Sequence, residues 1–378
     1  MKKVFIIVTF IFISIFNVYA QENNYIEDIY NDQIKISGAN DIIDALPKET
    51  HESLNDLGID KIDWDMFSEL TAEKIFSEIF DIAKKQSYAP LSSITAVIGI
   101  MLLYALLDSM KLSFESKSLT GVMGAVSALC ICSIIVLPIV KCIGRASIVI
   151  SNSAKFMFCY IPIMSGLMIS SGQVVSGTSY YFLMVSVGEV IAQLSSGILA
   201  PLLNIFLALS VISSISPKIG FAGLCEFINQ AVKWVLGFVM SLFTGFLTIK
   251  SIVATAADNT STKTAKMFIS SFIPIVGGAL SDAFNTVQSC VKLLKSSVGA
   301  FAILAAGFIF IPILLECLIW LLSLGLCNSI GDVLNLTKIC SLLKSSSKVM
   351  STMLVIIICC MTILIISTVI VLVMGCGS

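Results

Sequence analysis

Residues 349–374, VMSTMLVIIICCMTILIISTVIVLVM, decide the fold class of this chain. The stretch contains no charged residue and exceeds the roughly 20 residues that a helix needs to cross the hydrocarbon core of a bilayer. Because lipid offers no partners for backbone N–H and C=O groups, a segment of this kind must cross as a helix. Residues 298–324 form a second such stretch, with Glu316 as its one charged residue.

The rest of the chain is also strongly apolar and poor in charged residues. Of its 378 residues, 57% are hydrophobic and only 12% are charged, and the mean hydropathy is +0.98. Soluble domains carry about 25% charged residues, so most of this chain is suited to a non-aqueous environment. Further apolar stretches cover residues 91–107, 119–140, 148–170, 174–194, 198–215, 221–247 and 267–280. We predict an all-α polytopic membrane protein of six to eight apolar helices.

Several of these stretches do not resemble simple spans. Residues 174–194 and 198–215 form a pair separated by Gly197 and Pro201. Residues 221–247 suit either a span or an interfacial helix, and residues 267–280 are too short to cross and suit a re-entrant or broken helix. The lysines and arginine between the stretches all favour the cytoplasm, and they cannot all reach it if every stretch crosses once. One or more elements are therefore predicted to be re-entrant or interfacial.

The N-terminus resembles a secretory signal. Lys2 and Lys3 precede the apolar residues 4–16, and residues 18–20, Val-Tyr-Ala, resemble a cleavage site. We predict a cleaved signal peptide over residues 1–20, with an uncleaved anchor as the alternative. In both cases the positive-inside rule places residue 21 onward outside the cytoplasm.

Residues 21–90 differ from the remainder in charge. They contain 16 Asp and Glu against 6 Lys, a balance of −10, whereas residues 91–378 have a balance of +7. We predict an acidic extracytoplasmic helical segment over residues 21–90, ended by Pro90, and a multi-pass membrane domain over residues 91–378. The apolar patterns over residues 46–57 and 67–82 predict a small helical hairpin that lies on the membrane or on the first spans, with a partner-docking module as the alternative.

No catalytic signature is present. The sequence lacks the phosphate-binding loop, the zinc-protease motif and the nucleophile elbow, and His51 is its only histidine. The 12 cysteines lie in or between apolar stretches, where cysteine behaves as a small hydrophobic residue. We therefore predict a protein that is not an enzyme, with no cofactor, no metal site and no nucleic-acid partner.

Charged residues inside apolar stretches are the candidates for function. Glu189 and Glu316 lie within predicted spans, and Glu226 and Lys233 are seven residues apart, on one helical face. An ionisable group in hydrocarbon is costly, so it normally faces a bundle interior, a partner or water. We predict that these residues form a polar pathway or a subunit contact, the alternative for Glu226 being a position at a span end that reaches the headgroups.

A polar stretch beside a broken element is the other candidate. Residues 256–266 include Asp258, Lys263 and Lys266, and they lead to Pro274, Gly277 and Gly278. Transporters build sites in the middle of the membrane from polar backbone next to proline- and glycine-broken helices. A cytoplasmic loop has the same composition, so both interpretations stay open.

Small residues recur at helical spacing in one of the strongest spans. Gly299, Ala302, Ala305 and Ala306 form a face of the small-xxx-small kind, which lets two helices approach closely. Packing within the bundle is the interpretation that we favour over contacts between copies.

Several runs resemble the stage III sporulation protein AE family of endospore-forming Firmicutes. They are KWVLG at residues 233–237, FTGFLT at 243–248, Ala257 and Asp258 with Lys263 and Lys266, FIPIVGG at 272–278, Ser281 and Asp282, and Glu316. The similarity extends over nearly the whole chain. It implies a multi-pass membrane subunit of the channel, or feeding-tube, complex between mother cell and forespore, which supports endospore formation and late forespore sigma-G activity. The expected partners are other products of the same operon, including ring-forming proteins and a separate ATPase, and the lipid bilayer.

The resemblance implies a permease-like or export-platform component in the mother-cell-derived membrane around the forespore, and it carries no catalytic residues. Two alternatives come from other classes of protein. One is an independent secondary transporter, which an internal inverted repeat would favour. The other is a membrane scaffold that anchors partners without conducting anything.

Overall fold

The computed structural model describes residues 33–62, 70–109, 117–193, 197, 200–215, 222–272 and 277–373. All regular structure in these residues is helical, which confirms the predicted all-α class. Two short helices, α3 (Asp41–Asp44) and α4 (Lys48–Asp56), precede the long ones. The long helices are α6 (Ala72–Ser109), α7 (Lys117–Ser170), α8 (Val174–Gln193), α9 (Ala200–Ile215), α10 (Ala222–Phe272), α11 (Gly277–Val333) and α12 (Thr337–Val373).

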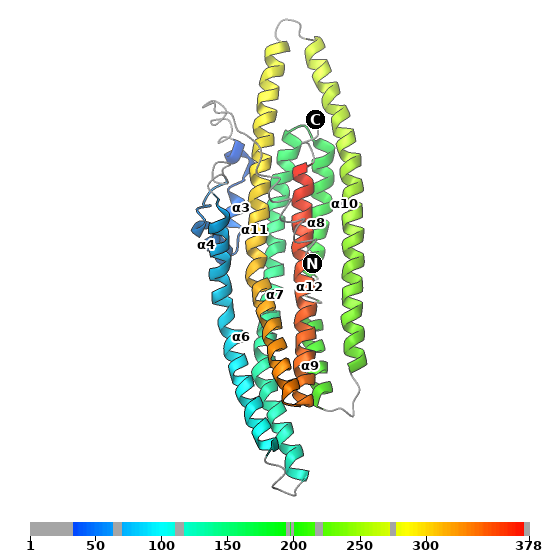
Figure 1. Ribbon diagram of the computed structural model, residues 1–378. Coiled ribbons are helices and arrows are strands. Elements are labelled where there is room, and N and C mark those ends of the chain that lie inside the picture. The colour runs from blue at the N-terminus through cyan, green and yellow to red at the C-terminus, as the bar shows by residue number, and fades with distance from the viewer. Residues whose placement is uncertain are drawn as a thin grey trace.

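The long helices lie side by side in one elongated bundle (Figure 1). Helices α6 and α11 run toward one end of the bundle, and α7, α10 and α12 run toward the other. Helices α8 and α9 follow one another in the direction of α6 and together make one pass. Residues 174–194 and 198–215 therefore follow one another toward the same end of the bundle instead of folding back as a hairpin. Helix α8 packs mainly on α7, whereas α9 packs mainly on α12.

Six helical segments of the described chain are long and apolar enough to cross a membrane: Ala72–Leu106, Leu129–Ser170, Val174–Gln193, Gly223–Asp258, Val287–Val333 and Ile339–Val373. This number agrees with the lower limit of the predicted six to eight. Helix α11 has 57 residues, which corresponds to about 85 Å at 1.5 Å per residue. A hydrocarbon core of roughly 30 Å covers only part of that length, so the bundle projects well beyond the bilayer.

Two predicted boundaries fall within continuous helices. Residues 119–140 and 148–170, which we predicted as separate spans, belong to one helix, α7, which continues through Pro138 and Pro162. Helix α6 continues through Pro90, which we predicted as the boundary between the acidic segment and the membrane domain. A proline removes one backbone donor, but the remaining hydrogen bonds and the packing of the neighbouring turns hold the helix in one piece.

Residues 267–280 do not form an element of their own. Residues 267–272 are the last turns of α10 and residues 277–280 are the first turn of α11, so the predicted break lies between two long helices. Pro274 is outside the described residues. The ends of α10 and α11 project beyond the other helices at one end of the bundle (Figure 1).

The core of the bundle is centred on α11. Phe301, Ala302, Ala305 and Phe310 are all fully buried, and α11 packs on α6, α7 and α12. The predicted small face is used for this packing, because Gly299 lies directly against the side chain of Leu372 on α12. A Cβ atom added at Gly299 would clash with the side chain of Leu372.

The segment before α6 packs on the outside of this core. Helix α3 contacts α7 and α4 contacts α11, and Ile42 and Leu54 are buried between them and the bundle. The thiol of Cys159 on α7 donates to the backbone carbonyl of Asp41 at 3.5 Å. This packing agrees with a segment that lies on the spans, although one of its supports is α11 and not only an early span.

Candidate functional site

The most extensive set of buried polar contacts surrounds the turn between α7 and α8. Helix α7 ends at Ser170, and Gly172 adopts a positive φ of 87°, a backbone conformation that glycine accepts at no steric cost. The amide of Gln173 then donates to the carbonyl of Met168 at 2.9 Å. The turn brings the first turn of α8 next to α10 and α11.

Asp258 of α10 caps the N-terminus of α8. Its two carboxylate oxygens accept the backbone N–H groups of Val175 and Ser176, both at 2.8 Å. The first N–H groups of a helix have no partner within the helix, and the helix dipole favours a negative charge there. Asp258 is 3% exposed, so a carboxylate 82 residues away in sequence takes the place of a local capping side chain.

Two residues of α11 complete the cluster. Gln288 donates from its side-chain amide to the carbonyl of Ser171 at 2.8 Å, and Lys295 donates to the side-chain oxygen of Gln173 at 3.2 Å. Lys295 is 4% exposed. We call Ser171, Gln173, Asp258, Gln288 and Lys295 the turn cluster. It joins α7, α8, α10 and α11 at one level of the bundle.

A second buried charge lies between α7 and α11. Glu316 is 2% exposed, and both of its carboxylate oxygens accept hydrogen bonds from the guanidinium of Arg145. The bond from Arg145 Nε to Oε2 is 3.0 Å long. This bidentate geometry, with two hydrogen bonds from one guanidinium to one carboxylate, is the strongest arrangement for an arginine–carboxylate ion pair. The Arg145 side chain is 49% exposed, so the pair reaches from the core to the bundle surface.

A third set of polar contacts joins α10 to α12. Lys348 Nζ lies 2.5 Å from Glu226 Oε2, and the hydroxyl of Thr352 donates to the side-chain oxygen of Asn229 at 2.8 Å. Thr352 and Asn229 are both buried. Together with Asp258, these contacts attach α10 to the bundle at two widely separated levels.

The remaining predicted site residues that the structure describes are spread over α8, α10 and the start of α11. Glu189 lies on an exposed face of α8, where it accepts a hydrogen bond from Gln193 at 2.9 Å, and Lys233 is exposed on α10. Lys263 and Lys266 belong to α10, but their side chains are outside the described part, as is the whole of Pro274. Gly277 and Gly278 begin α11. A polar pathway through these positions stays a prediction.

The partners that sequence reasoning missed include Arg145, Gln288, Lys295 and Lys348. It assigned Arg145 and Lys295 to basic loops because each lies a few residues before a long apolar stretch. The burial of Lys295 follows from the helix continuing far beyond the apolar stretch, which no local pattern reveals. No sequence pattern around Gln288 indicated that its side chain would take part in a buried polar contact.

Most of the side chains buried between these polar contacts are apolar. Phe301, Ala305, Phe308 and Ile309 of α11 are buried there, as are Ile356, Ile357 and Leu364 of α12. The turn cluster and the pair of Arg145 and Glu316 are therefore separated mainly by hydrocarbon side chains. Buried polar residues also lie on the same helices, among them Ser153 and Ser165 of α7 and Ser367 and Thr368 of α12.

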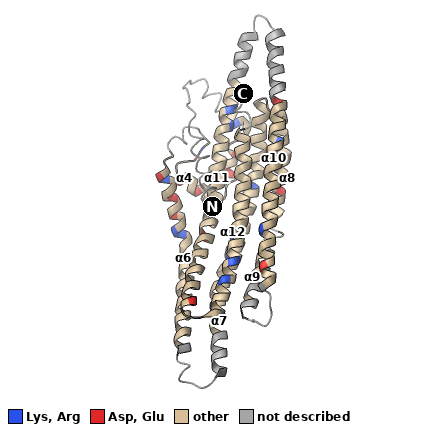
Figure 2. Ribbon diagram, turned by 45° about the vertical axis from the view of Figure 1, so that its right-hand side comes forward, with Lys and Arg blue, Asp and Glu red and all other residues tan. Residues whose placement is uncertain are grey.

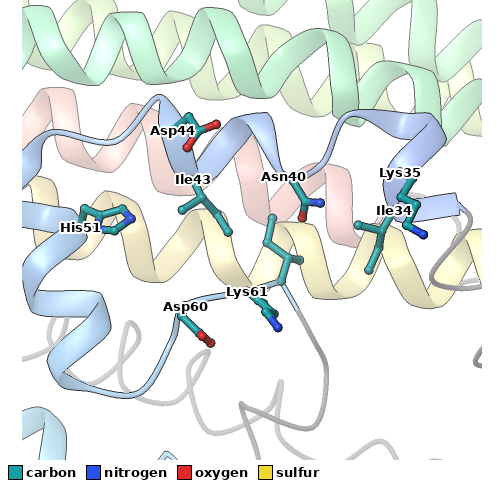
Figure 3. Close-up of a pocket in the computed structure, with 9 residues that line it drawn as sticks. Ile34, Lys35, Asn40, Ile43, Asp44, His51, Asp60 and Lys61 are labelled. Carbon is teal, nitrogen blue, oxygen red and sulfur yellow. The ribbon is translucent and has the colours of Figure 1, made fainter.

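An open groove lies in the segment before α6 (Figure 3). It has a volume of about 570 Å³ and is lined by Ile34, Lys35, Asn40, Ile43, Asp44, His51, Asp60, Lys61 and Ile62. Its polar side chains carry both signs of charge. The imidazole Nδ1 of His51 is 3.1 Å from the side-chain amide nitrogen of Asn55. Among the described residues, no group of three His, Cys, Asp or Glu side chains is placed to hold a metal ion.

Known proteins resemble this chain over most of its length. The family model described as stage III sporulation protein AE matches residues 65–375. Stage III sporulation protein AE of Bacillus subtilis (strain 168) is 26% identical over 193 residues, which cover 50% of this chain and 48% of that protein. The chain thus spans about half the length of this curated relative in the match. No solved structure matches the chain.

Proposed function

The chain belongs to the stage III sporulation protein AE family, and we propose that it is a multi-pass membrane subunit of the channel complex between mother cell and forespore. In this role it supports endospore formation and late forespore-specific transcription from the membrane that surrounds the forespore. The observation that carries the proposal is the family match over residues 65–375, which include every long helix of the bundle.

The bundle has properties that suit a platform within a larger assembly. Its longest helices exceed the thickness of a bilayer more than twofold, so a large helical surface is available to partners outside the lipid. The groove beside α4 adds a polar surface of mixed charge. We propose that ring-forming subunits and a separate ATPase of the same complex are the partners, and that residues 21–90 lie in the space between the two membranes.

A role as an independent secondary transporter has less support. Such proteins hold their substrate near the middle of the membrane, between broken helices. In this chain most of the side chains buried in the described interior are apolar. A scaffold or platform whose passage is formed between subunits agrees better with this core, and a single chain that conducts by itself agrees less well.

Deletion of the gene in the sporulating host, followed by complementation, tests the proposal. We expect the deletion strain to engulf its forespores but to lose late forespore-specific reporter activity and heat-resistant spores. The wild-type chain should restore both. Heat-resistant spores at wild-type numbers in the deletion strain would refute the proposed function.

A comparison of two variants tests whether buried charge contributes to that function. Glu316→Gln removes the buried carboxylate charge, and Glu189→Gln makes the same change at an exposed position. We expect reduced spore counts for Glu316→Gln only, with immunoblots of the membrane fraction separating loss of activity from loss of protein.

A further inference from the structure

Helix α6 carries its charge-free run toward the end of the bundle where α11 turns into α12. Met101 of α6 lies against Gly331 of α11, and the two helices run in the same direction (Figure 1). With an equal rise per residue in both helices, position 86 of α6 lies beside about position 316 of α11. Residues 86–107, which contain no charged residue, therefore extend from that level to the turn between α11 and α12.

Helix α7 has a charge-free run at a similar level. Residues 118–140 precede Arg145, which pairs with Glu316 of α11, and α7 is antiparallel to α11. The run therefore also lies on the side of this pair that faces the turn between α11 and α12. Apolar side chains on the runs of α6 and α7 are more than half exposed, among them Leu103, Leu106, Leu129 and Leu137.

The contacts of α12 give the level of α10, which lies across the bundle from α6 in both views (Figures 1 and 2). The hydroxyl of Thr352 on α12 donates to the side-chain oxygen of Asn229 on α10, and Leu372 of α12 lies against Gly299 of α11. Counting along the helices from these contacts relates each position on α10 to a level on α11, and so to a level on α6.

The apolar run of α10 lies at a different level from that of α6. It covers residues 234–257, with Lys250 as its one charged residue, and Trp234 and Phe238 on it are more than half exposed. Its centre is about 35 Å along the bundle axis from the centre of residues 86–107. The exposed apolar surfaces on the two sides of the molecule are therefore offset by about the thickness of a hydrocarbon core.

A bilayer perpendicular to the helices, placed at the level of residues 234–257, would enclose the charged half of α6. Figure 2 shows charged side chains along this half. Phe76 and Phe80 are exposed there as well, but a charged side chain costs several times more in hydrocarbon than a phenylalanine gains. The exposed charged residues at this level are Glu73, Lys74, Asp81 and Lys84.

A perpendicular bilayer at the level of residues 86–107 would enclose charge on the other helices. Glu226 of α10 and Lys344 and Lys348 of α12 lie at this level, and their side chains are about half exposed. Neither placement therefore covers both apolar surfaces while it leaves the ionised side chains in water.

We propose that lipid chains cover an oblique belt of the bundle, formed by residues 86–107 of α6 and 118–140 of α7 on one side and by residues 234–257 of α10 on the other. The three runs have 22, 23 and 24 residues, close to the roughly 20 that cross a hydrocarbon core. The helices are then tilted from the bilayer normal, as transmembrane helices commonly are. The first half of α6 lies outside the lipid at a level where α10 is within it. The belt does not depend on the proposed role in the channel complex.

Thiol labelling of the full chain, reconstituted alone into vesicles of phosphatidylethanolamine and phosphatidylglycerol, tests the belt. Ser77→Cys on α6 and Ser241→Cys on α10 lie at one level by the same counting, and Ser92→Cys lies in the apolar run of α6. All three serines are exposed helical residues, so the substitutions are matched. A small charged methanethiosulfonate is present on both sides of the bilayer, and peptide mass spectrometry assigns the label to each position, which separates it from the native cysteines.

We expect Ser77→Cys to react more than about tenfold faster than Ser241→Cys and Ser92→Cys, because the reactive thiolate forms in water and not in hydrocarbon. Labelling after denaturation in detergent verifies that all three thiols are intact. Equal rates for Ser77→Cys and Ser241→Cys would mean that the lipid lies level across the bundle. Fast reaction of Ser92→Cys would mean that this part of α6 faces water in the isolated chain and is covered by a protein partner in the complex. Both results overturn the oblique belt.

Discussion

Glu316 is a buried residue whose carboxylate charge is balanced by a single partner, Arg145. It is 2% exposed, and Arg145 supplies both of its charged hydrogen bonds. Glu316→Gln keeps the shape but leaves the guanidinium without its counter-charge. We expect a loss of about 2 kcal/mol of unfolding free energy, the scale of a hydrogen bond to a charged group. Thermal unfolding in detergent, followed by circular dichroism, measures it.

The control is Glu189→Gln, which changes an exposed carboxylate and should stay within about 0.5 kcal/mol of the parent. The double variant Arg145→Gln with Glu316→Gln should lose less than the sum of the two single changes, because the pair acts as a unit. Strictly additive losses would show that the two side chains are not coupled.

Gly299 is a second residue for which the structure gives a specific prediction. The side chain of Leu372 occupies the space that a Cβ atom at position 299 would need. Gly299→Ala forces the end of that leucine to move, and we expect a loss of about 1–3 kcal/mol from overpacking. Leu372→Ala in the same chain should recover part of the loss. Gly307→Ala on the same helix meets no atom within 4 Å and should be neutral or stabilising. Equal melting temperatures for Gly299→Ala and Gly307→Ala would contradict the close contact of α11 with α12.

At the scale of elements, α8 depends on α10 for its first turn. Asp258→Ala removes both acceptors from the amides of Val175 and Ser176, and a lost cap costs about 1 kcal/mol. We expect faster hydrogen exchange at the start of α8, measured by mass spectrometry in detergent, and no change at its far end near Gln193. Unchanged protection of these two amides would show that Asp258 does not cap the helix.

At the scale of the whole molecule, the bundle has two ends with different exposure to reagents. Val174 opens α8 at one end and Val333 closes α11 at the other, and both side chains are exposed. The predicted export of residue 21 onward puts the Val174 end outside the cytoplasm. An impermeant thiol reagent added to intact cells that carry the chain in their plasma membrane should therefore label Val174→Cys, and should label Val333→Cys only after permeabilisation. The reverse pattern would invert the topology.

The sequence by itself determined the class of the protein. Charge-free runs such as residues 349–374 leave the backbone no choice except a helix in lipid, so the all-α polytopic fold followed from composition and length alone. Runs such as FIPIVGG at residues 272–278 indicated the family in the same way. These signals are local, because each depends on a few consecutive side chains.

The tertiary structure decided where helices end and which charges meet. The continuity of α6 through Pro90 and of α7 through Pro138 depends on packing partners that a proline does not reveal. Asp258 looked like part of a polar loop, yet it caps a helix that begins 84 residues earlier. The physical reason is that a buried charge is stable only beside its partner, and the partner is chosen by how the long helices align.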